Sequence, residues 1–164
     1  MPASVTMRER SLVLVLVDLA HFTQAIAGRS LQELTELVDA FYRLAGTVIP
    51  QHRGRIVKFI GDGCFAVFDV DDTLAALAAV DELRARVQEM QLDLGANLHL
   101  STVAEGQLGL DGAYEVLGMG VIHTFRMGGG PGTRISDRVY RKLPSDRRSG
   151  WRKHQPPATY ELAR

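Results

Sequence analysis

The hydrophobic positions of this chain follow two spacings, and each spacing predicts one type of secondary structure. Residues 11–18 form a short, nearly continuous run of Val and Leu, which is typical of a strand buried in the middle of a sheet. Over residues 31–48 the apolar positions recur every three or four residues, which is helical spacing. Ser30 and Glu33 match a capping box, so we expect this helix to begin directly after Ser30, with Pro50 closely following its end.

The next segment alternates between apolar runs and turn residues. Residues 54–59 and 64–68 are apolar runs joined by Ile-Gly-Asp-Gly, and Asp-Gly between such runs predicts a β-hairpin. Asp71 and Asp72 are suitable caps for a second helix, which we expect from residue 73 to about residue 90 because this stretch is rich in Ala and Leu.

The remaining sequence predicts shorter elements that are separated by glycine. In chain order we expect a strand over residues 96–104, a turn at 111–112, a strand over 114–117, a helix that ends at 126, a glycine-rich break over 128–132 and edge strands over 134–136 and 158–162. The order βαββαβ with a C-terminal extension predicts an α+β fold with a ferredoxin-like core. We expect residues 1–10 to be a flexible N-terminus and residues 11–164 to be a single domain.

Composition restricts the class of protein. Of the 164 residues, 46% are hydrophobic and 23% are charged, which is ordinary for one globular domain and excludes disordered and fibrous classes. No apolar run approaches the roughly 18 residues that span a bilayer, so we expect no membrane partner. The single cysteine, Cys64, cannot form an internal disulfide, which favours a reducing, cytoplasmic setting.

The net charge is zero, but it is unevenly distributed. Residues 126–164 contain 10 Lys or Arg and 3 Asp or Glu. A basic segment of this kind can bind an anionic small ligand, meet an acidic face in a dimer or bind nucleic acid. Aromatic residues are not interleaved with the basic ones, as base stacking would require, so we expect no nucleic-acid partner.

Two aspartates stand at the ends of predicted strands. Asp18 closes the first apolar run, and Asp62 lies in the turn of the expected hairpin. Carboxylates at the rim of a sheet are accessible to a ligand, and two of them together favour a hard cation such as Mg²⁺. The structural alternatives are a helix cap for Asp18 and an ordinary turn residue for Asp62. The first interpretation predicts phosphate chemistry.

Several motifs resemble the catalytic domain of class III adenylate and guanylate cyclases. The similar segments are VDLAHFT at residues 17–23, KFIGD at 58–62, VLG at 116–118, RM at 126–127 and PGTRIS at 131–136. The first two resemble the family's two metal motifs, and their occurrence in this order, separated by one helix, is specific. The resemblance extends over residues 11–143 and identifies a cyclase homology domain.

The resemblance implies a two-metal enzyme that acts as a homodimer. In this family two catalytic domains pair head to tail, so that one domain supplies both aspartates and the other supplies the remaining catalytic groups. By this resemblance Asp18 and Asp62 bind two Mg²⁺ or Mn²⁺ ions, with help from the carbonyl of Leu19. Backbone amides around Phe22 and Thr23 are expected to hold phosphate oxygens of the nucleotide.

The resemblance also implies which residues contact the base and the α-phosphate. Lys58 corresponds to the family's base-selecting lysine, and Glu115 corresponds to its partner position, which is usually aspartate in adenylate cyclases. This pair favours ATP. Arg126 corresponds to the arginine that stabilises charge on the α-phosphate. The implied reaction is conversion of ATP to 3′,5′-cyclic AMP and pyrophosphate, a signal-transduction activity.

One position departs from the family's pattern. Ile122 replaces an asparagine that orients the ribose, and isoleucine cannot hydrogen-bond a sugar. His123 is adjacent, but it points about 100° away around a helix. Three interpretations are open: a slow enzyme, a different way of holding the nucleotide, or an inactive nucleotide-binding module that regulates a partner. GTP or a pyrimidine nucleotide is also an open alternative as substrate.

Overall fold

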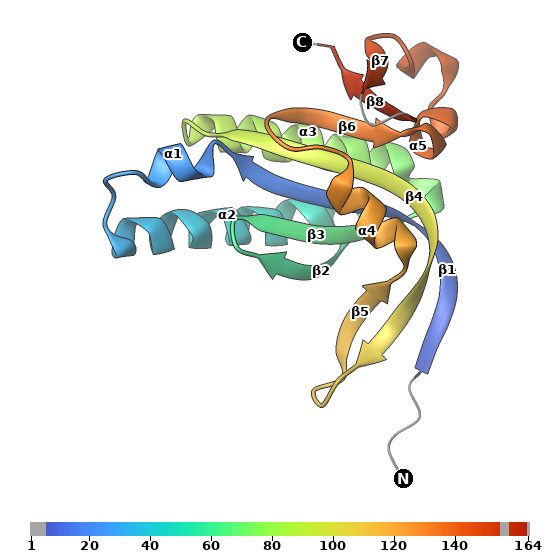
Figure 1. Cartoon of the computed structure of the whole chain (residues 1–164), viewed down its shortest axis with the longest axis horizontal. Helices are drawn as coiled ribbons and strands as arrows, with labels where there is room; N and C mark the ends of the chain where they lie inside the picture. Colours follow the sequence, from blue (N-terminus) through green and yellow to red (C-terminus); the bar gives the residue numbers. More distant parts are fainter. Residues whose placement is uncertain (1–5, 155–157, 164) are drawn as a thin grey trace.

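The computed structural model describes residues 6–154 and 158–163, and one mixed β-sheet organises them (Figure 1). Within this part of the chain the strands are β1 (Thr6–Ala20), β2 (Arg55–Ile60), β3 (Gly63–Asp69), β4 (Asp93–Leu108), β5 (Ala113–Leu117), β6 (Gly132–Ser136), β7 (Trp151–His154) and β8 (Thr159–Leu162). Their order is β2-β3-β1-β4-β6-β8-β7, and β5 pairs with β4 outside this path. The part β2-β3-β1-β4 is the expected ferredoxin-like core.

Helices cover both faces of this sheet. The described residues form α1 (Phe22–Ile26), α2 (Leu31–Gln51), α3 (Thr73–Glu89), α4 (Met119–Arg126) and α5 (Asp137–Lys142), with 3-10 turns at Val70–Asp72 and Ser145–Arg147. The long helices α2 and α3 pack together over one face, whereas the short α4 lies on the other face against β1 and β4 (Figure 1). The architecture is therefore α+β, as the sequence predicted.

The first apolar run is a central strand because both of its faces are buried. Val13, Val15 and Val17 point into the larger core under α2 and α3. Leu12 and Leu14 point into a smaller core on the opposite face. A strand between two hydrophobic layers has no polar face, which explains why the sequence shows a continuous run rather than alternation.

The predicted start of the long helix is confirmed. The hydroxyl of Ser30 accepts a hydrogen bond from the amide of Glu33 (3.2 Å), and the Glu33 carboxylate accepts one from the Ser30 amide (2.7 Å). Pro50, in contrast, lies inside the last turn of α2 rather than after it. Asp72 directly precedes α3, but among the described residues its carboxylate bonds the Arg53 side chain (2.8 Å) and does not cap the helix.

Two expectations about the ends of the chain are wrong. Residues 6–10 belong to β1 instead of a loose N-terminus, because β4 extends to Leu108 and pairs with them from Thr6 onward; residues 1–5 lie outside the described part. Residues 134–136 and 158–162 are not edge strands. β6 lies between β4 and β8, and β7, which the sequence did not predict, pairs with β8 and forms the edge.

Two further features bear on the remaining sequence expectations. Within the described residues, no helix combines the length and apolarity that crossing a membrane requires. Cys64 is buried in β3, and this burial raises the pKa of its thiol to about 12, so it remains a protonated core residue at neutral pH.

Candidate functional site

Asp18 and Asp62 lie together at one end of the sheet. β1 and β3 are antiparallel neighbours, and their register pairs Asp18 with Gly63. The Leu19 amide donates a hydrogen bond to the backbone carbonyl of Asp62 (3.1 Å), which ties the hairpin turn to the end of β1. Two residues that are distant in the sequence are thus brought side by side by strand pairing.

The environment of Asp18 disfavours its charge in the absence of a cation. Burial, followed by the negative charge of Asp62, raises the pKa of Asp18, whereas Arg134 acts in the opposite direction. Space around the carboxylate also depends on Gly95, which pairs with Asp18 from β4. A Cβ atom at Gly95 would lie 2.6 Å from Oδ1 of Asp18 and 2.5 Å from the carbonyl oxygen of Gly130, so only glycine fits there.

The oxygen ligands around Asp18 and Asp62 suit a hard cation whose coordination shell is completed by water or substrate. Among the described residues, no group of three or more His, Cys, Asp and Glu side chains is placed to hold a metal by itself. Asp18 and Asp62 offer two carboxylates, and backbone carbonyls such as that of Leu19 are close by. Mg²⁺ is usually bound by one or two carboxylates, with water and substrate phosphates completing its shell. The residues present therefore fit such an ion.

The raised pKa of Asp18 gives a testable consequence for stability. Because the folded state holds a proton at Asp18 more readily than the unfolded chain does, metal-free protein should lose stability as pH rises through the pKa of Asp18. We expect Asp18→Asn to remove this loss and to raise the melting temperature at neutral pH. Thermal unfolding in chelator across the acidic and neutral range measures this, with Asp111→Asn, at an exposed turn, as the matched control. A lower melting temperature for Asp18→Asn than for the control would contradict the electrostatic account.

The expected phosphate-binding residues lie immediately after β1. His21 has a left-handed backbone (φ 59°) and turns the chain into α1, which begins at Phe22. The Phe22 side chain packs against the main core, so its amide rather than its ring is the group left for a ligand. Thr23 is exposed in the first turn. The structure thus places both residues next to Asp18, as strand and helix are consecutive.

Lys58 and Glu115 meet although they are distant in the sequence. Lys58 lies on β2 and Glu115 on β5, and the Lys58 ammonium donates to the Glu115 carboxylate at 2.7 Å. Next to them, the Arg55 guanidinium stacks over the Tyr114 ring, 3.5 Å from its centroid. The side chains of Lys58 and Glu115 remain 42% and 25% exposed, so a ligand can reach them. The arrangement presents one strong donor beside one strong acceptor.

Helix α4 carries Arg126 at its exposed end. Ile122 lies one turn before Arg126 on the same exposed face, with 43% of its surface accessible. His123 is engaged elsewhere, because its ring packs in a tilted arrangement against His99, with centroids 4.4 Å apart. Burial, and next the proximity of His123, lower the pKa of His99 to about 4, so His99 is neutral at pH 7. His123 therefore does not replace the polar group that Ile122 lacks.

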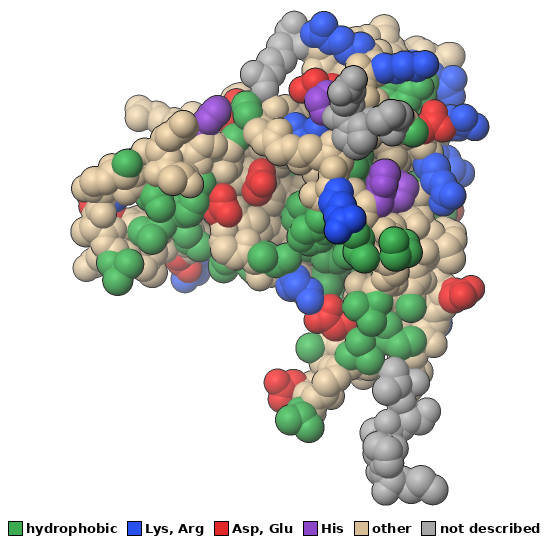
Figure 2. All heavy atoms as spheres, viewed as in Figure 1, with side chains coloured by type: hydrophobic (Ala, Val, Ile, Leu, Met, Phe, Trp, Pro, Cys, Tyr) green, Lys and Arg blue, Asp and Glu red, His purple; other side chains and the backbone are tan. Residues whose placement is uncertain are grey.

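Hydrophobic side chains gather on the face that carries α4. Figure 2 shows them over α4 and over the adjoining part of the hairpin that β5 forms with the end of β4. The exposed large hydrophobic residues of this region are Leu117 (48%), Met119 (76%), Ile122 (43%) and Phe125 (39%), which we call the α4 face. A contiguous apolar patch beside charged groups is typical of an interaction surface.

Sequence reasoning missed two polar residues behind this face. Arg134 on β6 and Asn97 on β4 are only 2% and 3% exposed, and Nε of Arg134 donates to Oδ1 of Asn97 at 2.7 Å. The sequence carried little signal, since β4 and β6 contain other polar residues as well. Such residues are buried only when their hydrogen bonds are satisfied, but the partners cannot be identified from spacing.

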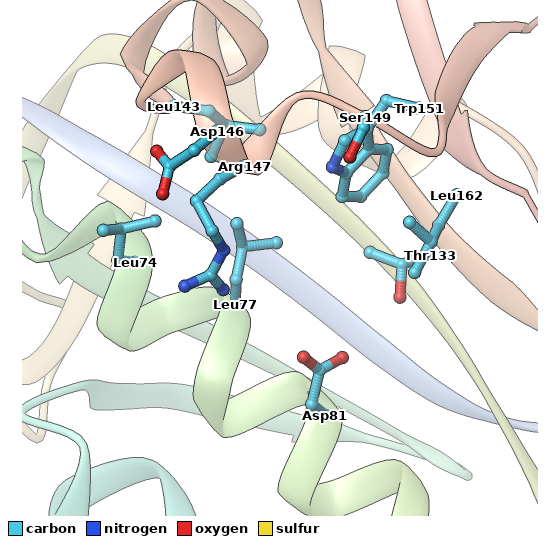
Figure 3. A pocket seen from close by; sticks show the side chains of 10 residues that line it. All are labelled: Leu74, Leu77, Asp81, Thr133, Leu143, Asp146, Arg147, Ser149, Trp151 and Leu162. Atoms are coloured by element: carbon cyan, nitrogen blue, oxygen red, sulfur yellow. The ribbon is translucent and has the colours of Figure 1, made fainter.

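A cavity of about 230 Å³ lies elsewhere, between α3 and the C-terminal segment (Figure 3). Leu77 and Asp81 from α3 form one wall, and Arg147 and Trp151 from the C-terminal segment form the other. None of the predicted site residues contributes to its lining. The candidate site is therefore the open surface that carries the aspartates, Lys58, Glu115 and Arg126, and it is not this cavity.

No protein-family model matches the chain. The uncharacterized protein Rv1320c of Mycobacterium tuberculosis is 31% identical over 118 residues, which cover 65% of this chain and 20% of that protein. The chain thus spans about a fifth of the length of the curated relatives it matches.

Solved structures give the fold. The guanylyl cyclase Cya2 superposes with a TM-score of 0.79 at 23% identity, covering 94% of this chain and 92% of that one. The adenylyl cyclase CyaB from P. aeruginosa superposes with a TM-score of 0.82 at 18% identity, covering 98% and 97%. The chain therefore has the fold of class III adenylyl and guanylyl cyclase catalytic domains, which confirms the fold that the sequence motifs implied.

Proposed function

We propose that this chain is a nucleotidyl cyclase domain that converts ATP to 3′,5′-cyclic AMP and pyrophosphate. The observation that carries the proposal is the juxtaposition of Asp18 and Asp62 at the end of two neighbouring strands, in a chain with the fold of adenylyl and guanylyl cyclases. A domain without catalysis has no need to keep two partly buried carboxylates side by side, where burial and then the charge of Asp62 raise the pKa of Asp18.

The proposed reaction is an in-line displacement at the α-phosphorus. The ribose 3′-hydroxyl releases its proton to solvent and its oxygen forms a bond to the α-phosphorus, while the bond from that phosphorus to the bridging oxygen of the β-phosphate breaks and pyrophosphate leaves. Asp18, Asp62 and the Leu19 carbonyl would hold Mg²⁺ or Mn²⁺, two ions per site. Bound there, these ions would lower the pKa of the 3′-hydroxyl and neutralise phosphate charge.

The chain's own residues supply the other contacts. The amides of Phe22 and Thr23, at the start of α1, would donate to phosphate oxygens. Arg126 would stabilise the negative charge that develops on the α-phosphate, since a guanidinium bridges two phosphate oxygens with fixed geometry. Its exposed position at the end of α4 leaves the group available to a ligand.

The proposed active form is a homodimer with two shared sites. The α4 face is apolar and exposed, and three of its four residues lie on the same helix as Arg126. In a two-fold pair, the aspartates of one protomer would face Lys58, Glu115 and Arg126 of the other. Burial of the α4 face against a second copy would then assemble each site and remove the apolar surface from water.

Base selection is proposed to depend on the pair Lys58 and Glu115. Adenine presents a ring-nitrogen acceptor next to an amino donor, which matches an ammonium beside a carboxylate. We expect Lys58→Glu to lower the ratio of kcat/KM for ATP over that for GTP at least about 10-fold, because the ring-nitrogen contact is lost and two like charges meet. Steady-state kinetics with both nucleotides measure this, with Arg55→Glu on the same strand as control. An unchanged ratio would remove Lys58 from this role.

The test of the activity is a direct product assay. Purified protein is incubated with Mn²⁺ and each of ATP, GTP, CTP and UTP, and products are identified by mass spectrometry. Cyclic AMP as the main product supports the proposal, and another cyclic monophosphate would keep the reaction but change the base. No product from any nucleotide, with a folded dimer present, would favour a nucleotide-binding regulatory module, which the apolar Ile122 beside Arg126 also suggests.

A further inference from the structure

A buried polar network lies between α4 and the sheet. The side-chain oxygen of Asn97 accepts a hydrogen bond from Arg134 (2.7 Å). Its nitrogen donates to the backbone carbonyls of Thr124 and Gly128, both at 3.0 Å. Nη2 of Arg134 also donates to the carbonyl of Gly130 (3.1 Å). The Asn97 amide is therefore bonded on both its oxygen and its nitrogen in a site that excludes water.

The two carbonyls bound by Asn97 flank Arg126. Thr124 lies two residues before Arg126, and Gly128 lies two residues after it, at the point where α4 ends. The last carbonyls of a helix have no partner within the helix and need one from outside. The Asn97 amide supplies that partner and so holds the last turn of α4, from which Arg126 projects, onto β4.

Apolar contacts also hold α4 at this end, but they fix its position with less directionality than hydrogen bonds do. The helix has only eight residues; Phe125 near its end contacts Phe65 of β3 edge to face, with ring centroids 5.6 Å apart, and Met127 directly after it is buried. Thr124 is buried, but its hydroxyl donates within the helix, to the carbonyl of Gly120 (2.7 Å). A helix this short has little stability of its own, so its position depends on contacts with the sheet.

We propose that Asn97 is a positioning residue that holds Arg126 in place for catalysis, and that Arg134 keeps the Asn97 amide in the orientation this requires. The inference rests on the proposed function, because it concerns the same site. Asn97 acts through the backbone of α4 and touches neither nucleotide nor cation. Loss of its amide would let the end of α4 shift, and a displacement of about 1 Å at a catalytic group can cost about 100-fold in rate.

Two substitutions separate the hydrogen bonds that Asn97 donates to α4 from the hydrogen bond that it accepts from the buried Arg134. Asn97→Ala removes both the acceptor for Arg134 and the donor for the two carbonyls. Asn97→Asp keeps an acceptor for Arg134 but places carboxylate oxygen against the carbonyls of Thr124 and Gly128. We expect both variants to lower kcat about 100-fold with little change in KM for ATP. Ser101→Ala is the control, because Ser101 lies on the same strand against Gly120 at the start of α4 and, within the described residues, its hydroxyl donates to the carbonyl of its neighbour Thr102 and not to α4.

Heterodimers distinguish displacement of Arg126 from a general loss of function in the chain that carries the Asn97 substitution. Chains carrying different tags are co-expressed, purified through both tags and assayed for cyclic nucleotide. The reference pair is Asp62→Ala with Arg126→Ala, which keeps one intact shared site of two and should retain about half of the wild-type activity. We expect Asn97→Ala and Asn97→Asp to be rescued by Asp62→Ala, because the Asp62→Ala chain contributes a well-placed Arg126. Neither should be rescued by Arg126→Ala.

The outcomes are distinguishable. An active reference pair together with this rescue pattern supports the inference. If the reference pair is active but Asp62→Ala does not rescue Asn97→Ala and Asn97→Asp, the positioning role is overturned and the proposed function is left intact. A wild-type kcat in Asn97→Asp would have the same meaning. An inactive reference pair, with both dimers folded, overturns the shared-site function and the inference with it.

Discussion

Asp62→Ala is expected to lower cyclic nucleotide formation at least about 1000-fold. The substitution removes one of the two carboxylates that lie together at the ends of β1 and β3. A single remaining carboxylate, that of Asp18, would hold two divalent cations poorly, so both activation of the 3′-hydroxyl and neutralisation of the triphosphate would fail. The fold should persist, because the hydrogen bond from the Leu19 amide to residue 62 uses the backbone carbonyl and not the side chain.

The measurement combines activity with an independent measure of cation binding. Mn²⁺ that binds the folded protein raises its melting temperature, and Asp62→Ala should lose this increase along with activity. Asp111→Ala, at an exposed turn between β4 and β5, changes the same residue type and should behave like the wild type in both assays. Activity within about 10-fold of wild type in Asp62→Ala would refute two-metal catalysis at these carboxylates.

Met119→Glu is expected to convert the dimer to monomers and to abolish activity with it. Met119 is the most exposed residue of the α4 face at 76%, so it contributes little to the fold of one chain and offers a large surface to a second. In a two-fold interface the substitution occurs twice and places two carboxylates in an apolar contact, which would weaken association at least about 100-fold.

Light scattering coupled to size-exclusion chromatography gives the oligomeric state, and the product assay gives activity in the same fractions. Leu31→Glu is the matched control, because Leu31 is 80% exposed on α2, in the helix layer on the opposite side of the sheet. It should remain dimeric and active. A monomeric Met119→Glu with full activity would show that a single chain holds the whole site, and a dimeric one would place the interface elsewhere.

Local elements were predictable because their causes lie within a few residues. The Val/Leu run at residues 11–18 predicts a doubly buried strand, and the structure confirms that its alternate side chains enter two cores. The capping box at Ser30 and Glu33 involves residues three apart and forms as predicted. The two aspartates were located for the same reason, as each directly follows or interrupts an apolar run.

Strand neighbours were less predictable, because they depend on segments far away in the sequence. Residues 6–10 look polar and unstructured by themselves, yet β4 pairs with them, and Glu105 accepts hydrogen bonds from Arg8 (2.9 Å) and Arg10 (3.2 Å). β6 was expected at an edge. It is internal because β4 pairs with it on one side and β8 on the other.

By itself, the sequence determined the longer strands and helices, though not β7, and the ferredoxin-like order of the core, because apolar periodicity is a local property. It also singled out the candidate site residues at the strand ends. Only the tertiary structure showed the polar contacts themselves: the family resemblance paired Lys58 with Glu115, but nothing in the sequence paired Asn97 with Arg134. Lys58 and Glu115 are 57 positions apart, and Asn97 and Arg134 are 37 apart, yet each pair is joined by a hydrogen bond of 2.7 Å. Such pairs arise from the order and register of strands in the sheet, which are set by packing of the whole chain and leave no spacing signal in any short segment.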